Sequence, residues 1–327
     1  AAVTVTAVKS GETDAQAQSI PANEGQTAVS QTAADLGTYT IEAADKAGNT
    51  TTAAFTIAPV DADIKAEPKT ITYDATAYDV SQLFTFGDGV GTKTYTVTGG
   101  TGFGTLSGSA LTISQAGTFI ISVTTAPNGY TARGTALATL TVRKAQGTAA
   151  LTIENVTYGT PISPQPSSTT NADKGYTITY KTADGTQLQT APTDAGDYTA
   201  TVTYEANDFY EAASATTTFT IGRKEIVISG IKAKDKTYDG TTAAGLVCDD
   251  VVFGGILEGD TLTISAEGAF ADAEAGEAKT VAITNLTLGG ESAANYVLAE
   301  AGQQTTATAT ITAQAGEITT QIEKKED

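Results

Sequence analysis

One short phrase occurs three times in this sequence, and it constrains the fold more than any other feature. In each copy a glycine is followed two residues later by an aromatic residue, which opens a run of alternating apolar and polar residues. The copies are Leu36–Ile41, Ala116–Ile121 and Ala195–Val202. A second alternating run follows each copy after a polar loop, at Thr52–Ile57, Leu137–Val142 and Thr216–Ile221. A period of two predicts half-buried strands, and two such runs in succession predict a hairpin.

A hairpin alone buries too little surface to fold, so each predicted hairpin must close a larger β module. Alternating or β-branched runs supply the other expected strands. They are Lys69–Tyr73, Lys93–Val97, Ala110–Ile113, Ala149–Ile153, Tyr176–Lys181, Tyr198–Tyr204, Glu225–Ser229, Thr261–Ala266, Lys279–Leu288, Tyr296–Leu298 and Thr305–Thr312. The composition, rich in Thr, Ala, Gly and Val, favours strands over helices.

Counting back from each hairpin divides the chain into modules. We expect a short or partial module at residues 1–59, modules at 60–144, 145–222 and 223–313, and a solvent-exposed tail or linker at 314–327. The joints between these modules are only a few residues long, which leaves little slack. The predicted fold class is therefore all-β, with tandem β-sandwich modules in an elongated array.

The chain lacks the residues that most catalytic mechanisms require. The chain has no His, Met or Trp and a single cysteine, Cys248. Without His, the Ser-His and Cys-His nucleophile pairs and His-ligated zinc are excluded, and a lone cysteine forms no intrachain disulfide. We expect Cys248 to be a small buried apolar residue, with a reactive thiol as the alternative. We therefore expect neither an enzyme nor a resident cofactor.

The charge balance constrains the partners. The chain carries 18 Lys and Arg against 37 Asp and Glu, for a net charge of -19. Such a chain repels nucleic acid and anionic membranes, and its self-repulsion favours a monomer. No apolar run approaches the roughly 20 residues that span a bilayer, so we expect no membrane insertion in this segment.

Acidic side chains are the main candidates for ligand chemistry. Calcium takes oxygen ligands, and Asp61 and Asp63 lie at the first expected joint. A solvated acidic face is the alternative interpretation. Surface modules can also carry Lys-to-Asn isopeptide bonds, for which Lys232, Lys234 and Lys236 with Asn285 are candidates; exposed lysines on an edge strand are the alternative.

Three aromatic residues near the end of the module at 145–222 are candidates for stacking on a sugar ring. They are Tyr204, Phe209 and Tyr210. An exposed row of such rings would indicate a glycan-binding surface.

Two separated motifs in the last module carry a family resemblance. Lys236-Thr237-Tyr238-Asp239-Gly240-Thr241-Thr242, followed by Asn295-Tyr296-Val297-Leu298, resembles the opening and closing signatures of the bacterial YDG immunoglobulin-like repeat. Thr72-Tyr73-Asp74-Ala75 and Val156-Thr157-Tyr158-Gly159-Thr160-Pro161 resemble weaker forms of the same opening, as in the related MBG repeats. Residues 36–57 resemble the final hairpin of other bacterial immunoglobulin-like domains.

The resemblance implies immunoglobulin-like sandwich repeats from large secreted or surface-exposed bacterial proteins, with no catalytic residues to transfer. We therefore expect a structural or adhesive region outside the cell, which binds an unidentified protein or glycan on a host or neighbouring cell. The alternative is a carbohydrate-binding accessory region of a larger secreted enzyme.

Within the signature itself, Asp239 and Gly240 fit a tight turn. We expect the ring of Tyr238 to lie across the edge of the core, with its hydroxyl bonded to a backbone partner. A ligand-stacking ring is the alternative interpretation.

Overall fold

A computed structural model describes residues 3–10, 20–22 and 35–314 of the chain. The expected tail at 314–327 lies outside the described residues, except for its first residue. The chain divides into two compact units. Unit 1 contains residues Ala1–Gln146 and Ala206–Glu211, and unit 2 contains Gly147–Glu205 and Ala212–Asp327.

The first sheet of unit 1 has the strand order β2-β1-β3-β4. Its strands are β1 (Val3–Lys9), β2 (Ile20–Ala22), β3 (Gly37–Ala44) and β4 (Thr50–Ile57). The predicted hairpin is confirmed, since β3 and β4 pair antiparallel from Gly37 with Ile57 to Ala44 with Thr50. Strand β1 was not predicted, although its alternating Val and Thr residues carry the signal.

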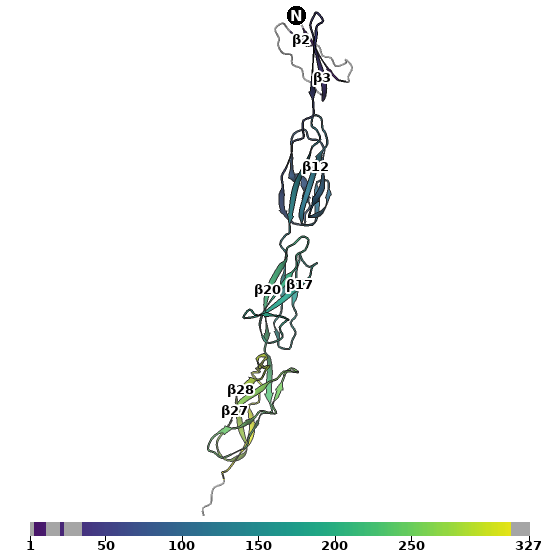
Figure 1. Cartoon of the computed structure of the whole chain (residues 1–327). Helices are drawn as coiled ribbons and strands as arrows, with labels where there is room; N and C mark the ends of the chain where they lie inside the picture. The colour runs from purple at the N-terminus through teal and green to yellow at the C-terminus, as the bar shows by residue number, and fades with distance from the viewer. Residues whose placement is uncertain (1–2, 11–19, 23–34, 315–327) are drawn as a thin grey trace, which may run out of the picture. The chain divides into compact units, whose positions relative to one another are not determined.

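The second β module of unit 1, which we call the second sandwich because it follows the sheet of the first module, runs from β5 to β13 (Figure 1). Its strands are β5 (Ile64–Ala66), β6 (Lys69–Thr72), β7 (Tyr78–Asp79), β8 (Phe84–Phe86), β9 (Lys93–Gly100), β10 (Phe103–Ser107), β11 (Ala110–Gln115), β12 (Gly117–Thr125) and β13 (Thr135–Arg143). The sheet β6-β13-β12-β9 and the sheet β10-β11-β7 enclose one core. Leu111, Phe119, Ile121 and Leu140 are fully buried there, because the alternate residues of each strand point inward.

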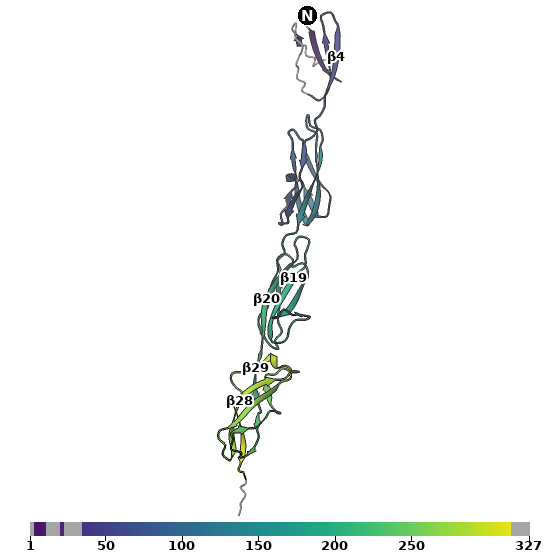
Figure 2. The same cartoon turned by 60° about the vertical axis from the view of Figure 1, so that its left-hand side comes forward.

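The third sandwich belongs to unit 2, and its strands β19 and β20 lie side by side (Figure 2). The strands are β14 (Ala150–Thr152), β15 (Val156–Thr157), β16 (Gln165–Ser167), β17 (Tyr176–Thr182), β18 (Gln187–Leu188), β19 (Gly196–Tyr204) and β20 (Ala213–Gly222). The sheet β15-β20-β19-β17-β18 packs on the pair β14-β16. Buried residues alternate along β19, at Tyr198, Ala200, Val202 and Tyr204.

The fourth sandwich completes unit 2. Its strands are β21 (Lys224–Ser229), β22 (Lys232–Ala233), β23 (Lys236–Thr237), β24 (Ala243–Ala244), β25 (Leu246–Val247), β26 (Val252–Gly254), β27 (Thr263–Phe270), β28 (Gly276–Gly289), β29 (Tyr296–Leu298) and β30 (Thr306–Thr312). The sheet β23-β30-β28-β27-β24 faces the sheet β26-β21-β29. One core gathers around Ile226, Ile228 and Tyr296, and a second gathers around Phe270 and Ile311.

The prediction of an all-β chain is confirmed in the described residues, with β-sandwiches in the second, third and fourth modules, and the expected strands are present with shifted ends. Within the described residues the structure has no α-helix, only two short 3-10 segments, at Val80–Leu83 and Ala293–Asn295. None of its helical segments has the length and apolar character needed to cross a membrane. Cys248 is free and half-buried against the core of the fourth sandwich.

Candidate functional site

Three tyrosines occupy the same place in the second, third and fourth sandwiches. In each sandwich a short strand pairs parallel with the last strand: β6 with β13, β15 with β20, and β23 with β30. The tyrosine that follows the short strand then donates its backbone N–H to the last strand. Tyr73 bonds to the carbonyl of Arg143 at 2.9 Å, Tyr158 to that of Gly222 at 2.8 Å, and Tyr238 to that of Thr312 at 2.8 Å.

The turns after Tyr73 and Tyr238 are also alike. The Oδ1 atom of Asp74 accepts the N–H of Thr76 at 2.9 Å, and Oδ1 of Asp239 accepts the N–H of Thr241 at 2.9 Å. The residue between the aspartate and the threonine has a positive φ, 64° at Ala75 and 76° at Gly240. Gly240 adopts this conformation without the strain that a Cβ causes, which explains the Asp-Gly pair.

The ring of Tyr238 does not lie where the sequence suggested. It is 40% exposed and belongs to neither core cluster of the fourth sandwich. The neighbouring Lys236 fills the space inside the turn instead, with its ammonium 5.6 Å from the centre of the Phe270 ring. The expectation of a ring packed across the core edge therefore does not fit this geometry.

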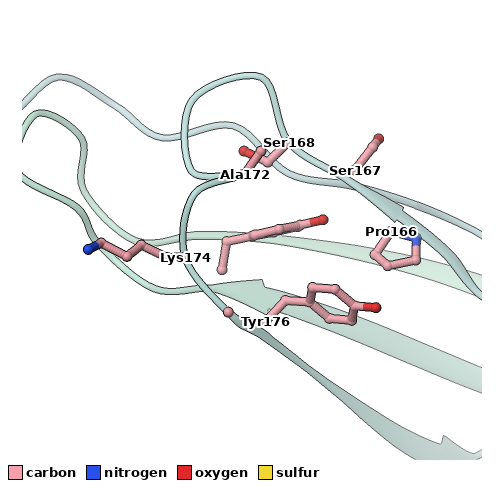
Figure 3. Close-up of a pocket in the computed structure, with 8 residues that line it drawn as sticks. Pro166, Ser167, Ser168, Ala172, Lys174 and Tyr176 are labelled. Carbon is pink, nitrogen blue, oxygen red and sulfur yellow. The ribbon is translucent and has the colours of Figure 1, made fainter.

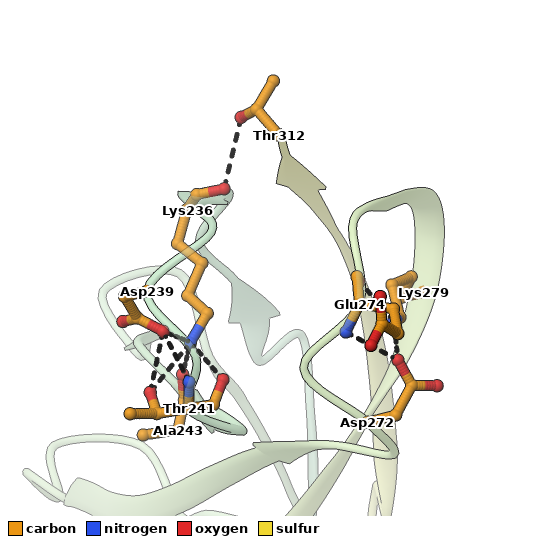
Figure 4. A network of polar contacts seen from close by, with 8 residues as sticks. All are labelled: Lys236, Asp239, Thr241, Ala243, Asp272, Glu274, Lys279 and Thr312. Atoms are coloured by element: carbon orange, nitrogen blue, oxygen red, sulfur yellow. Dashed lines mark hydrogen bonds and ion pairs between the residues drawn. The ribbon is translucent and has the colours of Figure 1, made fainter. Parts of the chain in front are cut away.

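The ammonium of Lys236 holds the loop that follows Tyr238 (Figure 4). It donates to Oδ1 of Asp239 at 2.8 Å and to the carbonyls of Thr241 at 2.7 Å and Ala243 at 3.0 Å. Only 16% of the Lys236 side chain is exposed. The bond from Lys236, with those from Thr241, lowers the pKa of Asp239 to about 2. The lysine of the signature thus holds the turn closed through charge-assisted hydrogen bonds.

Lys279 repeats this arrangement on β28 (Figure 4). Its ammonium pairs with Asp272 and donates to the carbonyl of Glu274 at 2.6 Å. The isopeptide candidates, by contrast, have separate partners. Lys232 pairs with Asp250 at 2.9 Å, whereas Asn285 donates to Glu267 at 2.6 Å. The structure does not bring the candidate lysines and Asn285 together in these contacts.

Within unit 2, the third and fourth sandwiches meet at the carboxylate of Asp260. The hydroxyl of Tyr158 donates to both carboxylate oxygens at 3.1 Å, and the hydroxyl of Tyr296 donates to the same group. Ser292 adds a bond at 3.2 Å. The rings of Tyr158 and Tyr296 cross edge to face, with centroids 5.4 Å apart, a geometry that aromatic pairs prefer.

A second set of contacts closes the same joint. The backbone N–H of Ala195 donates to Oδ1 of Asn295 at 2.8 Å, and Nδ2 of Asn295 donates to Asp194 at 3.1 Å. Gly159 has a φ of 88° and faces Leu257 so closely that a Cβ would stand 2.5 Å from its side chain. The two sandwiches are therefore held together at this joint by close side-chain packing as well as by hydrogen bonds.

The electrostatics of the joint follow from these bonds. The hydrogen bond from Tyr296, followed by those from Tyr158 and Ser292, lowers the pKa of Asp260. Burial, together with the bond to Asp260, raises the pKa of Tyr296 to about 12. Burial raises the pKa of Tyr158 as well. A charged Asp260 between two neutral tyrosines is the favoured state near neutral pH.

The calcium candidates Asp61 and Asp63 are exposed, and the backbone carbonyl of Asp63 accepts the N–H of Gly87 at 2.8 Å. In residues 3–10, 20–22 and 35–314, no group of three or more His, Cys, Asp or Glu side chains lies close enough to hold a metal ion. Calcium at Asp61 and Asp63 therefore stays a prediction from the sequence.

The three aromatic candidates do not form an exposed row. Tyr204 is only 4% exposed. Phe209 and Tyr210 lie in the segment Ala206–Glu211 of unit 1 and are half-buried against Tyr73, whose ring centroid is 4.5 Å from that of Phe209 and 5.8 Å from that of Tyr210. Packing between rings, rather than presentation to a sugar, accounts for their placement.

An open hollow of about 570 Å³ does lie beside Tyr204 in the third sandwich (Figure 3). Tyr176 pairs with Tyr204 across the strands, with ring centroids 5.4 Å apart, and is 51% exposed. Lys174, Pro166 and Ser167 also line the hollow. Tyr176 was not among the sequence candidates, because the register that sets it opposite Tyr204 is visible only in the folded sheet.

The structure places both motifs of the signature in the last sandwich. Lys236 of the first motif holds the turn through its bond to Asp239, and Asn295 and Tyr296 of the second motif lie at the joint. Residues 222–308 match the family model of the YDG domain. The matched segment covers β21 to β29 and the start of β30. We call it the YDG segment, and its resemblance to the YDG repeat is confirmed. The MBG-like identity of the two preceding modules stays a prediction.

Comparison with solved structures finds weak overall likenesses. Drosophila N-cadherin EC1-3 has 11% identity and a TM-score of 0.26, covering 76% of this chain and 99% of its own. The human desmocollin-1 ectodomain has 10% identity and a TM-score of 0.23, covering 95% and 75%. At these values the likenesses carry no inference about function. No curated protein sequence matches the chain.

The YDG segment shows what the sequence left unassigned. Lys236 and Asn295 stand in the signature motifs, yet their placement depends on partners distant in sequence, such as the Phe270 ring for the lysine and Ala195 for the asparagine. Asp260 lies outside both motifs, and nothing in its local sequence indicates a joint.

Proposed function

We propose that this chain is a non-catalytic structural and adhesive region, in which β-sandwich modules divided near residues 59, 144, 222 and 313 act as spacers outside a bacterial cell. The observation that carries the proposal is the joint of unit 2. Tyr158 from one module and Tyr296 from the next converge on Asp260, so the signature residues are used to connect modules. A spacer needs such joints more than it needs a cleft.

Several features support the extracellular setting and the kind of partner. Residues 222–308 match the YDG domain model, and the resemblance of their motifs to YDG repeats implies a secreted or surface-exposed bacterial protein. The net charge of -19 disfavours nucleic acid and anionic membranes and favours a monomer. The partner we propose is a protein or glycan on a host or neighbouring cell.

Single-molecule force spectroscopy on the full chain tests the spacer role. Independent sandwiches should resist pulling and open in successive steps, each releasing about 300 Å of chain for roughly 85 residues at about 3.6 Å per residue. Extension without such steps would contradict a load-bearing array.

A carbohydrate-binding accessory role is the second candidate, favoured by the hollow at Tyr176. Its size falls within the range of ligand pockets, and an exposed ring beside polar groups suits a sugar. Affinity electrophoresis on soluble polysaccharides tests it. A glycan that binds in the hollow should slow the migration of the wild-type chain in the gel and leave the migration of the Tyr176→Ala variant unchanged. Equal mobility of both chains in every polysaccharide would remove this candidate.

A further inference from the structure

The opening tyrosine of two sandwiches packs against rings from beyond its own sandwich. Tyr73 follows β6 and stacks on Phe209 at 4.5 Å, in the segment Ala206–Glu211 of unit 1. Tyr158 follows β15 and packs on Tyr296 of the fourth sandwich at 5.4 Å. Both tyrosines are half-buried, and burial raises the pKa of each. In both cases the ring packs against its own core and adds a contact beyond it.

Tyr238 has the same backbone position but not the contact. Its N–H bonds to the last residue of β30, just as the N–H of Tyr158 bonds to the last residue of β20. Across the part of the chain that the structure describes, no aromatic ring packs against Tyr238, and its side chain is 40% exposed. The turn beside it is nevertheless fixed by Lys236 and Asp239. The ring is thus held in place by its turn and left uncovered.

We propose that Tyr238 is the docking residue for a further β-sandwich module that follows β30 along the chain. This inference rests on the proposed role as an array of modules. The docked module would present what Tyr158 meets in the YDG segment, namely an aromatic ring and a carboxylate. The occupant is an attached module rather than a free ligand, because both covered tyrosines meet protein rings.

The connection supports this choice of occupant. Tyr158 bonds to the carbonyl of Gly222, and the next sandwich begins two residues later, at Lys224. Tyr238 bonds in the same way to Thr312. In this chain residues 313–327 follow Thr312, and a module joined directly to Thr312 would reproduce the link that places Tyr158 against Tyr296.

A chain in which residues 223–312 are repeated directly after Thr312 tests the proposal. Hydroxyl-radical footprinting with mass spectrometry reports the exposure of each tyrosine, and a Thr242→Ser marker in the second copy separates the two Tyr238 peptides. We expect Tyr238 of the first copy to react several-fold more slowly than in the native chain. Tyr238 of the second copy should react as in the native chain, and Tyr158 should stay protected in both chains, which verifies folding.

Three results would overturn the proposal. One is equal reactivity of the first-copy Tyr238 and the native residue while Tyr158 is protected. Another is concentration-dependent protection in the native chain, which would assign the ring to a second copy of the chain. The last is measured on the native chain without a repeated copy. Tyr238→Ala should leave its denaturation midpoint unchanged. A decrease in the midpoint as large as that caused by Tyr296→Ala would place the Tyr238 ring in the core of its own sandwich. If the first-copy Tyr238 stays reactive in the footprinting experiment while the chain unfolds in steps under force, this inference fails and the proposed spacer role stands.

Discussion

Lys236 illustrates how a single side chain can hold a turn. Its ammonium bonds to one carboxylate and two backbone carbonyls and is largely shielded from water. Charge-assisted bonds in a shielded site contribute more than exposed ion pairs do. Lys232 offers a natural comparison, since its pair with Asp250 leaves both side chains mostly exposed, at 65% and 71%.

Replacing Lys236 should therefore destabilise the fourth sandwich, while replacing Lys232 should not. We expect Lys236→Met to cost about 2 kcal/mol, because the carbonyls of Thr241 and Ala243 lose their donor. Lys232→Met should leave the midpoint of urea denaturation unchanged. Equal midpoints for the two variants would show that the hydrogen bonds of the Lys236 ammonium contribute no stability.

Tyr296 makes the fourth sandwich sensitive to alkali. Its pKa in the folded chain is about 12, above the ordinary value of 10, so the protonated form is favoured by folding. The resulting stability is fully present below pH 10 and is lost as the pH rises toward 12. We expect Tyr296→Phe to flatten the fall of the melting temperature across this window, relative to wild type. Tyr176→Phe, at an exposed ring, is the matched control; a fall as steep in Tyr296→Phe as in that control would refute the assignment.

At the scale of elements, the closing hairpins were predictable because their signal is local. Strands β12 and β13 pair along their length, and β19 pairs with β20 from Gly196 with Ile221 to Tyr204 with Ala213, as the alternation indicated. The glycine and aromatic residue that open each hairpin are adjacent to the strand that they position. Period and turn chemistry are sufficient for such an element.

The short parallel strands and the joint depend on distant partners and were therefore harder to predict. β15 has two residues and pairs with the end of β20, and Tyr158 then contacts Asp260, which lies 102 residues further along the chain. The Asp239-Gly240 turn leads to the expectation that the ring of Tyr238 lies across the core edge, but the ring is 40% exposed. The pattern does not show that Lys236 fills the turn.

The joint of unit 2 gives a prediction at this scale. Tyr158→Phe keeps the ring contact with Tyr296 and removes the bond to Asp260, so it should lower the stability of unit 2 by about 1 kcal/mol. Tyr130→Phe is the control, since Tyr130 is 46% exposed. Guanidinium titration of the full chain, followed by circular dichroism, measures both. Coincident curves for the two variants would show that the Asp260 bond does not stabilise the joint.

The proposed spacer role depends on modules that stay separated along the chain. The sequence places only a few residues between consecutive modules, and in unit 2 the space around that link is filled by Tyr158, Tyr296 and Asn295. Acidic self-repulsion acts in the same direction, since like charges disfavour collapse of the chain onto itself. The proposed spacer role requires this separation in solution.

Small-angle X-ray scattering of the full chain tests that requirement most directly. A compact globule of this length has a radius of gyration of about 20 Å, and the unfolded chain has one of about 65 Å. The spacer account predicts a value well above the first and below the second, independent of protein concentration. A radius of gyration near about 20 Å would contradict the account, because modules folded back on one another cannot act as spacers.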